Sequence, residues 1–179
     1  MVSALTPKKN MDRTYKIMAP GVYVGSAPYD EQHFLTLINQ GFVIFVDLTI
    51  FNEKFPDGTR VYEYANYNNL TRYHYPITDK RVPADMVNFY QFLKPVAQDI
   101  LAGKKTYIHC RGGHGRSGLV AAVLLILCVN YNAEQALDLV YRAHQTRPNM
   151  NAKMRKLGAP QTAKQKQFVR DFYQYYSSL

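Results

Sequence analysis

The chain has 179 residues, of which 47% are apolar, and it carries a formal net charge of +9. This length and apolar content suit a single globular domain, and the two cysteines, Cys110 and Cys128, exclude a disulfide-stapled fold. The positive charge favours polyanionic partners such as phosphorylated proteins, anionic lipid head groups and nucleic acid.

The N-terminal residues show no long apolar core of the kind that marks a signal peptide. The longest apolar run, Leu119 to Val129, is too short to cross a bilayer, so we expect no transmembrane segment. We therefore expect an intracellular protein, cytoplasmic or nuclear, in a reducing compartment where thiols stay free. No sequence feature specifies an oligomeric state.

The chain opens with polar residues, so we expect a flexible segment over residues 1–15 and one folded domain over residues 16–179. Runs of β-branched and apolar residues predict strands at Val22–Val24, Phe42–Leu48, Leu70–Ile77 and Lys105–Ile108. Apolar residues at helical spacing predict helices at Tyr29–Gln40, Met86–Leu101, Leu119–Val129 and Ala133–Gln145, and a last helix with Pro160 in its first turn.

Three details refine this pattern. Asp85 is a candidate N-cap for the helix that follows it, and Pro95 should kink or divide that helix. The basic stretch Lys153–Gly158 reads as a connector. Strands that alternate with helices predict an α/β domain, with a central mixed or parallel sheet flanked by helices on both sides. Open sheets of this class bind ligands at the carboxyl ends of their strands.

The most informative stretch is His109-Cys110-Arg111-Gly112-Gly113-His114-Gly115-Arg116-Ser117-Gly118, which links a predicted strand to an apolar helix. Its glycines let the backbone fold tightly, so that several N–H groups can point inward beside a helix N-terminus. In such a field a thiol pKa falls from about 8.5 into the range of roughly 3.5–7.5. The planar guanidinium of Arg116 can hold two phosphoryl oxygens.

Cys110 followed by five residues and then Arg116, with His109 before and Ser117 after, resembles the signature of the cysteine-dependent protein phosphatases. The resemblance is greatest to the dual-specificity branch, and the early Val24-Gly25-Ser26-Ala27 stretch resembles the opening of many of its members. It implies that residues 16–179 form a single catalytic domain with the phosphatase fold.

The resemblance also assigns roles. Cys110 is expected to attack phosphorus and form a phosphocysteine, while Arg116 and the backbone N–H groups of the loop hold the oxyanions. Ser117 would hydrogen-bond the sulfur, and His109 would support the loop and tune the thiolate. The expected phosphate-binding residues of the loop are Arg111, Gly112, Gly113, His114, Gly115 and Arg116. No cofactor and no metal are implied, and the histidines show no ligand spacing.

The leaving oxygen needs a proton donor on a separate loop. Asp79 follows a predicted strand and has Pro83 nearby, and its placement resembles the general-acid loop of dual-specificity phosphatases. Asp79 could instead cap the following turn, and Asp85 is a competing candidate. A second short element, with Gln161 and Gln165, resembles the motif that positions the hydrolytic water in classical tyrosine phosphatases, although a polar helix start explains it nearly as well.

The expected substrates are phosphoproteins carrying phosphotyrosine and also phosphoserine or phosphothreonine. Two alternatives share the superfamily: a phosphoinositide phosphatase, because Arg111 and His114 occupy loop positions that are basic in tensin-like enzymes, and an RNA 5′-triphosphatase. A non-enzymatic alternative is a phosphate-binding pseudophosphatase scaffold. Such scaffolds usually lack the cysteine, the arginine or the acid, and this chain has candidates for all three.

Overall fold

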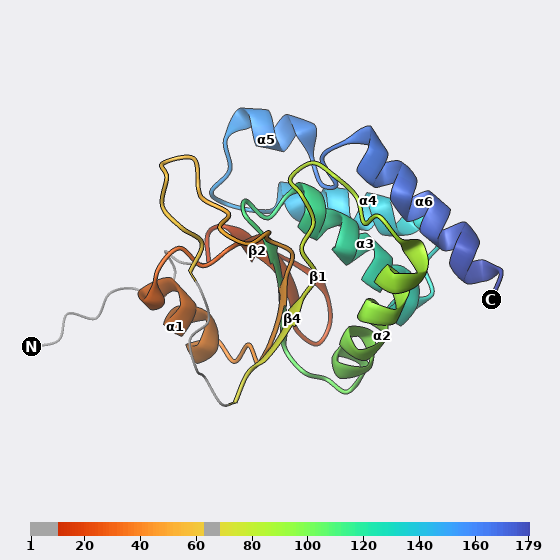
Figure 1. The fold of residues 1–179 in the computed structure, drawn as a ribbon, viewed down its shortest axis with the longest axis horizontal. Helices are drawn as coiled ribbons and strands as arrows, with labels where there is room; N and C mark the ends of the chain where they lie inside the picture. Colours follow the sequence, from red (N-terminus) through yellow and green to blue (C-terminus); the bar gives the residue numbers. More distant parts are fainter. Residues whose placement is uncertain (1–10, 63–68) are drawn as a thin grey trace, which may run out of the picture.

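The fold of the chain, a computed structural model, is built on a five-stranded sheet and is described for residues 11–62 and 69–179 (Figure 1). The strands are β1 (Thr14–Met18), β2 (Val22–Ser26), β3 (Ile44–Asp47), β4 (Thr71–His74) and β5 (Thr106–Cys110). Their order across the sheet is β1-β2-β5-β3-β4; β1 runs antiparallel to β2, and the other neighbouring pairs are parallel. The expectation of a mixed sheet is confirmed.

The helices are α1 (Glu31–Asn39), α2 (Met86–Leu101), α3 (Gly115–Val129), α4 (Ala133–Gln145), α5 (Ala152–Leu157) and α6 (Ala163–Ser177). Helix α1 lies on one side of the sheet and α2, α3, α4 and α6 on the other, so both faces are covered as expected (Figure 1). Every residue of β3 and β5 is buried, because these central strands are covered on both faces.

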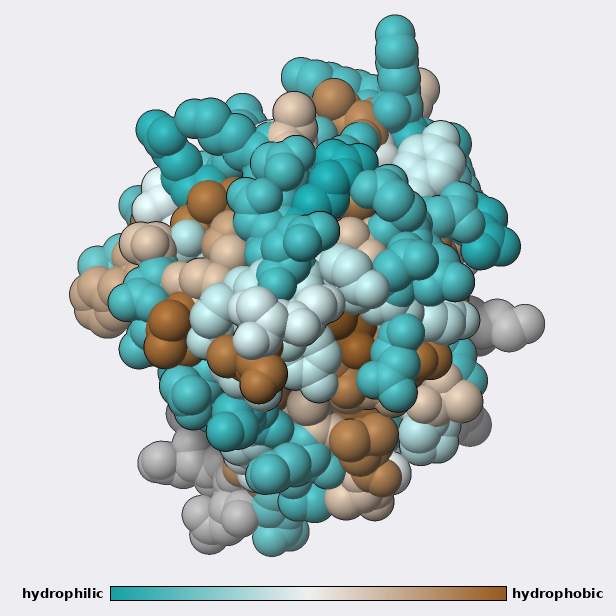
Figure 2. All heavy atoms as spheres, turned by 90° about the vertical axis from the view of Figure 1, so that its right-hand side faces the viewer, coloured by the Kyte–Doolittle hydropathy of each residue, from teal (hydrophilic) through white to brown (hydrophobic). Residues whose placement is uncertain are grey.

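Two apolar clusters hold the layers together. The larger one joins the sheet to α2, α3, α4 and α6, with α3 buried along most of its length. The smaller one packs Phe34 and Leu37 of α1 against Phe42, Phe45 and Tyr107, largely through edge and tilted ring contacts. The face over α2 and α6 mixes hydrophilic and hydrophobic side chains (Figure 2), and the exposed apolar residues there include Val87 and Leu101.

The expected flexible segment over residues 1–15 is wrong at its C-terminal end, because β1 begins at Thr14. Tyr15 and Ile17 are buried, and β1 pairs with β2 along the edge of the sheet. The strand is hard to recognise because Lys16 lies between these apolar residues and a polar run precedes them. Residues 1–10 lie outside the described part of the chain.

Three further expectations need correction. Helix α2 passes through Pro95 without a break, since Leu93, Val96, Ala97 and Ile100 of that region are buried in the core and outweigh the lost backbone hydrogen bond. The expected connector after Lys153 is the short helix α5, capped by Asn151. The last helix begins after Pro160, where Thr162 and Gln165 form a capping box.

Other local predictions are confirmed. Asp85 caps α2 by accepting from the Asn88 N–H, as predicted, and α4 lies over the predicted residues, with Asn132 and Gln135 forming a capping box at its start. None of the helices in the described part of the chain is both long and apolar enough to cross a membrane.

Candidate active site

The loop at residues 110–116, called the phosphate loop below, joins the end of β5 to the start of α3. Helix α3 begins at Gly115, earlier than the sequence suggested, so Arg116 and Ser117 lie in its first turn. Gly113 has a φ of +80°, and a Cβ there would lie 2.4 Å from the carbonyl carbon of Gly25. The tight loop therefore requires glycine at this position, both for backbone conformation and for its close approach to β2.

Cys110 lies at the bottom of this loop and is 3% exposed. Its Sγ accepts a hydrogen bond from the Gly113 N–H at 3.3 Å and lies 3.3 Å from the Ser117 hydroxyl. Burial alone raises the pKa of the Cys110 thiol, but the Arg116 charge, the Ser117 hydroxyl and backbone N–H groups together bring that pKa below its ordinary value. The site therefore favours a thiolate.

Arg116 is 1% exposed and is fixed by neighbours from two other loops. Its NH1 donates to Glu53 Oε2 and to the Ile77 carbonyl, both at 2.8 Å, and its NH2 lies 2.5 Å from Glu53 Oε1. Its buried Nε–H finds no hydrogen-bond partner among the described residues. The Glu53 carboxylate holds the guanidinium plane in place, and Nε is left for an anion in the loop.

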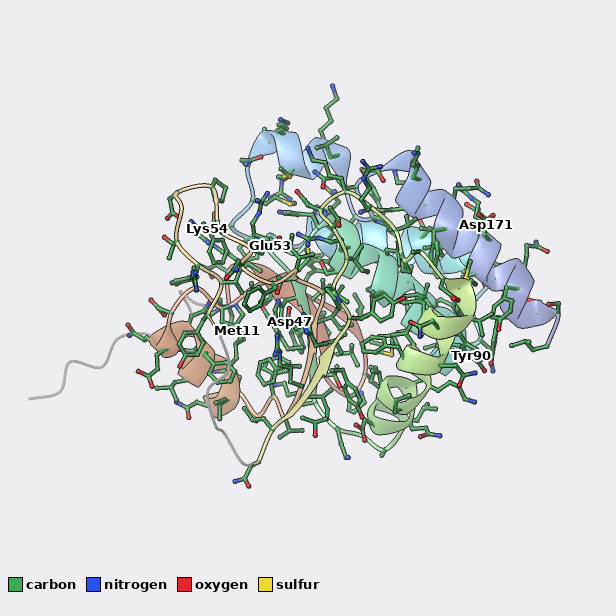
Figure 3. The ribbon with its side chains drawn as sticks, in the orientation of Figure 1. Met11, Asp47, Glu53, Lys54, Tyr90 and Asp171 are labelled. Atoms are coloured by element: carbon green, nitrogen blue, oxygen red, sulfur yellow. The ribbon has the colours of Figure 1, made fainter. Side chains whose placement is uncertain are left out.

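Glu53 is a site residue that sequence reasoning missed. It belongs to a polar loop after β3, and no spacing or motif distinguishes it from the other acidic residues there. Glu53, labelled beside Lys54 in Figure 3, lines a second hollow together with Asp47. Asp47 itself accepts from the Thr49 N–H and hydroxyl and from Arg72, so it is a structural hydrogen-bond acceptor.

Asp79 lies in the loop between β4 and α2 and lines the same cavity as Cys110. Its carboxylate lies 3.4 Å from Arg116 NH2 and 3.5 Å from Arg111 NH2, and its side chain is 42% exposed. Asp85, the competing candidate, is the N-cap of α2 and is not part of the cavity wall. The geometry therefore favours Asp79 over Asp85 as the proton donor.

The histidines of the loop are neutral. His109 is completely buried, with Nδ1 3.2 Å from the Cys110 carbonyl oxygen, and burial lowers its pKa despite the nearby Asp47 charge. His114 pairs its Nδ1 with His144 Nε2 at 2.8 Å. Burial, with the Arg147 charge and His144, lowers the pKa of His114 to about 3.

This neutrality bears on the resemblance to lipid phosphatases, which rested on two basic side chains in the loop. Of these two side chains, His114 is uncharged near neutral pH because of its low pKa. The Arg111 guanidinium reaches sideways to Asp79 and to the Lys54 carbonyl oxygen, 3.4 Å away, and so contacts the acid loop.

The two glutamines have separate positions. Gln161 lines the cavity, and its Nε2 lies 3.6 Å from Met154 Sδ. Gln165 is buried: its Oε1 accepts from the N–H groups of Gln161 and Thr162, and its Nε2 donates to the Arg81 carbonyl at 3.3 Å. Gln165 therefore ties the start of α6 to the segment that carries Asp79.

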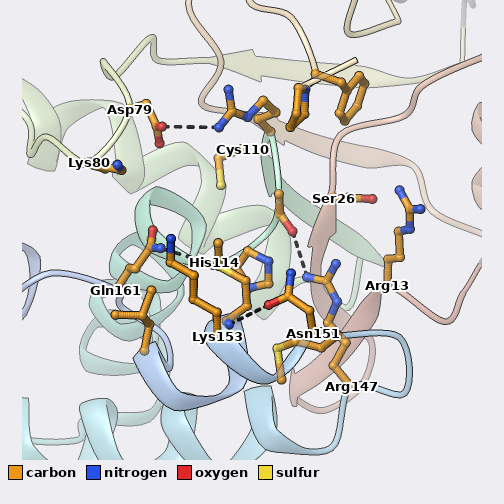
Figure 4. Close-up of a pocket in the computed structure, with 18 of the residues that line it drawn as sticks. Arg13, Ser26, Asp79, Lys80, Cys110, His114, Arg147, Asn151, Lys153 and Gln161 are labelled. Carbon is orange, nitrogen blue, oxygen red and sulfur yellow. Dashed lines mark hydrogen bonds and ion pairs between the residues drawn. The ribbon is translucent and has the colours of Figure 1, made fainter. Parts of the chain in front are cut away.

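A cavity of about 630 Å³ opens above Cys110 (Figure 4). Asp79 and Lys80 stand at one end of it and Arg13 and Arg147 at the other, with Cys110 between them. Nowhere in the described ranges do three or more His, Cys, Asp or Glu side chains gather as a metal site would require. A buried thiol, an anion clamp and a separate carboxylate in one cavity suit the hydrolysis of a phosphate monoester.

Comparison with known proteins agrees with this geometry. The family model described as "Swiss Army Knife protein, DSP-PTPase phosphatase domain" matches residues 12–169. The 197R protein of Invertebrate iridescent virus 6, named for a tyrosine phosphatase, is 39% identical over 132 residues, which cover 71% of this chain and 47% of that protein. The similarly named 067L protein of Invertebrate iridescent virus 3 is 34% identical over 174 residues, covering 91% of this chain and 66% of that protein.

This chain thus spans between about half and two thirds of the length of these two relatives. Among solved structures, Tk-PTP in its active form matches with a TM-score of 0.66 at 23% identity, covering 90% of this chain and 97% of that one, which shows a shared fold. The family match covers nearly the whole described chain and includes the phosphate loop. This chain therefore belongs to the dual-specificity branch of the cysteine-dependent protein phosphatases.

Proposed function

We propose that this chain is a protein phosphatase that hydrolyses phosphotyrosine, and also phosphoserine or phosphothreonine, through a phosphocysteine intermediate. The observation that carries the proposal is the state of Cys110. Its buried sulfur accepts from the Gly113 N–H, lies beside Ser117, and has a lowered pKa in a loop closed by Arg116. A structural core cysteine would need none of these neighbours; Cys128, for comparison, has its pKa raised to about 11 by burial.

In the proposed first step, the Cys110 thiolate attacks phosphorus while the bond from phosphorus to the substrate oxygen breaks. Asp79 gives its proton to that departing oxygen. The phosphoryl oxygens accept hydrogen bonds from Arg116 and from backbone N–H groups of the phosphate loop. Because these donors are fixed before substrate arrives, they can stabilise the developing charge without reorganisation.

In the second step, ionised Asp79 takes a proton from water, and the water oxygen attacks phosphorus. The bond from sulfur to phosphorus breaks, which releases inorganic phosphate and regenerates the Cys110 thiolate. Ser117 stabilises the departing sulfur through its hydroxyl. Gln161 lines the cavity and is the better placed of the two glutamines to orient this water, with Gln165 holding its backbone.

Several observations favour phosphoprotein over the alternatives. The lipid alternative is weakened because His114 is neutral, and the curated relatives reported above are named for tyrosine phosphatases. A pseudophosphatase scaffold is disfavoured because Cys110 and Asp79 line one cavity and Arg116 lies within 3.4 Å of Asp79. Chemistry that depends on a reduced thiol fits an intracellular setting, which we include in the proposal.

The test is phosphate release by the wild-type protein and Cys110→Ser, side by side and without metal. The panel holds phosphotyrosine and phosphothreonine peptides, a phosphoinositide and 5′-triphosphate RNA. We expect Cys110-dependent release mainly from the phosphopeptides, with Cys110→Ser binding them but not turning them over. Release mainly from lipid or RNA would overturn the substrate class, and full activity of Cys110→Ser would remove the nucleophile.

A further inference from the structure

The phosphate loop contains one of two hydrogen-bonded histidines that the proposed reaction does not use. His114 belongs to the loop and lines the cavity (Figure 4), whereas His144 lies in the last turn of α4 and is fully buried. His114 Nδ1 and His144 Nε2 are 2.8 Å apart, which is the distance of a good hydrogen bond. Between two imidazole rings, one nitrogen must donate and the other must accept, so this hydrogen bond has a direction.

The side chain of Gln145 determines that direction. Its Nε2 donates to the Arg155 carbonyl oxygen at 3.0 Å, and the same nitrogen lies 3.5 Å from His144 Nδ1. Since an amide nitrogen can only donate, His144 Nδ1 is the acceptor and carries no proton. The proton of a neutral His144 ring is then on Nε2, and it is donated to His114 Nδ1.

The opposite direction would leave polar atoms of a buried ring without partners. With its proton on Nδ1, His144 would point one donor at another, and its side chain is 0% exposed. A charged pair is also disfavoured. Burial lowers the pKa of His114 to about 3 and, with the charges of Arg147 and Arg155, lowers that of His144 to about 4. Both rings are therefore neutral near pH 7, and one chain of hydrogen bonds runs from Gln145 through His144 to His114.

This chain makes the other nitrogen of His114 a donor. Because Nδ1 accepts from His144, the proton of the neutral His114 ring is on Nε2. A Cβ built on Gly112 would lie 3.4 Å from that Nε2, so this edge of the ring lies against the phosphate loop. Within the part of the chain that the structure describes, Nε2 takes part in no hydrogen bond. The N–H group is therefore available to an oxygen of a phosphate in the loop.

Packing fixes the chain of hydrogen bonds before any substrate binds. The ring of Tyr15 in β1 contacts the His144 ring edge-on, with centroids 5.4 Å apart and an angle of 89° between the planes. At the other side, Arg155 NH1 donates to the Gln145 carbonyl oxygen at 2.6 Å, so the two residues are joined by hydrogen bonds in both directions. A donor held in this way loses little conformational freedom when an anion binds.

We propose that His144 is a positioning residue for substrate binding, which holds His114 in the tautomer that donates from Nε2 to an oxygen of the reacting phosphoryl group. The phosphate loop thereby gains a side-chain donor without an additional charge. A neutral donor suits this position, because Arg147 NH1 already donates to the Gly112 carbonyl at 2.7 Å and would repel a second cation. This inference rests on the proposed phosphatase function and deepens it.

The tautomer can be measured by NMR of Cys110→Ser with nitrogen-15 in its histidines. Long-range correlations between ring protons and ring nitrogens distinguish a proton on Nδ1 from one on Nε2. We expect both His114 and His144 to carry the proton on Nε2. We also expect inorganic phosphate, added until the backbone amides of the loop stop shifting, to move the Nε2–H resonance of His114. A proton on His114 Nδ1, or an unchanged Nε2–H resonance at saturation, would overturn the proposal.

The matched variants are His144→Gln and His144→Leu. Glutamine keeps an N–H group that can donate to His114 Nδ1, whereas leucine has a comparable size and no donor. In the Cys110→Ser background, we expect His144→Leu to weaken the binding of inorganic phosphate by about tenfold, as the loss of a hydrogen bond to a charged group does. His114→Leu, which removes the donor itself, should have the same effect, and His144→Gln should keep most of the affinity.

The kinetic constants separate this role from a merely structural one. A donor that contacts the phosphoryl group equally in the ground state and the transition state affects KM, so the loss in kcat/KM of His144→Leu should come from KM. If the two rings only braced the loop, their loss would misplace Cys110 and the backbone donors, and kcat would fall. A fall in kcat without a change in KM, or an equal loss in His144→Gln and His144→Leu, would overturn the proposal.

A double variant tests whether His144 acts through His114. His144→Leu should cause no further loss of phosphate affinity when it is added to His114→Leu, and additive losses would overturn the connection. The NMR measurement changes neither histidine, so it decides the tautomer even if a leucine variant does not fold. Failure of the proposed function looks different: wild-type protein would hydrolyse no phosphopeptide, whereas the Nε2–H resonance of His114 would still respond to inorganic phosphate.

Discussion

The two ends of the cavity differ in how their charges are balanced. At the end where Asp79 lines the cavity, the buried Arg116 has the carboxylates of Asp79 and Glu53 within 3.5 Å, and these three residues are called the acid wall. At the cationic wall, defined by Arg13, Arg147 and Lys153, the described residues provide no carboxylate partner, and Arg147 is oriented by backbone carbonyl oxygens instead. Both walls meet the phosphate loop, through Arg116 on one side and the Gly112 carbonyl on the other.

This difference separates two tasks. Catalysis needs groups that are held precisely and a carboxyl group that can exchange a proton, and in the proposed mechanism Glu53 would hold Arg116 and Asp79 would exchange the proton. Recognition of an anionic substrate needs uncompensated positive charge, which the cationic wall supplies. Changes at the acid wall should therefore mainly lower kcat, whereas changes at the cationic wall should alter substrate preference or stability.

The largest effect is expected from Arg116→Lys at the acid wall. A lysine keeps the charge but cannot make the planar, two-pronged contact with Glu53 and a phosphoryl group. We expect kcat/KM for phosphopeptides to fall by about 10³-fold, in line with the loss of a fixed oxyanion donor. Steady-state kinetics with circular dichroism as a folding control would measure it. Activity within tenfold of the wild type would show that charge alone suffices at this position.

Asp79→Asn should have the next largest effect, because it removes the proposed proton donor and keeps the size of the side chain. We expect kcat to fall by about 10²-fold on phosphopeptides and much less on p-nitrophenyl phosphate, whose leaving group needs little protonation. Asp85→Asn is the matched control, since asparagine also caps helices well and Asp85 lies outside the cavity wall. A larger loss in Asp85→Asn would reverse the assignment.

The cationic wall can be tested through stability, because Arg147 sits beside His114 and His144. Burial, with the charges of Arg147 and Arg155, lowers the pKa of His144 to about 4, and His114 has a pKa of about 3. Below about pH 6.5 the unfolded chain therefore binds protons that the folded protein does not. The contribution of these histidines to the free energy of unfolding should be complete above this pH. It should become smaller as the pH decreases toward their folded pKa values.

We expect each of these two histidines to contribute a loss on the order of 2 kcal/mol between pH 7 and pH 5, measured by urea unfolding. His109 contributes with the same sign, because burial lowers its pKa as well. In His144→Gln the pH dependence should become smaller, whatever the stability at pH 7. A free energy of unfolding that stays constant from pH 7 to pH 5 would mean that these histidines accept protons in the folded protein.

Much of the fold followed from the sequence because its signals are local. The N-cap Asp85 of α2 and the phosphate loop depend on neighbouring residues, and both lie where expected. Strand β1 was missed, since its buried residues are few and its stability comes from pairing with β2. The unbroken α2 was missed for a similar reason: core packing outweighs the local effect of Pro95.

The candidate site followed the same rule. The residues of the Cys110–Ser117 motif could be named from sequence alone. Asp79 could be chosen because its placement resembles the general-acid loop of dual-specificity phosphatases. Glu53 and the cationic wall could not, because they come from segments far apart in the chain that only the fold brings together. Arg13 precedes β1 and Lys153 belongs to α5, and the sequence predicted neither this strand nor this helix.

The smallest expected effect lies between the two walls, at the hydroxyl of Ser117. Ser117→Ala removes one of the groups that lower the pKa of the Cys110 thiol, so this pKa should rise toward its ordinary value. The measurement is the rate of alkylation by iodoacetamide as a function of pH. Cys128 should contribute little to the alkylation below pH 9, since burial raises its pKa to about 11, and a Cys128→Ser background removes its contribution altogether.

In Ser117→Ala the phosphocysteine should also break down more slowly, which would be seen as a burst of the first product before the steady state. An unchanged alkylation profile would mean that Arg116 and the backbone N–H groups are sufficient to stabilise the thiolate. The low pKa of Cys110 would then depend on the acid wall and the loop backbone, without a contribution from the Ser117 hydroxyl.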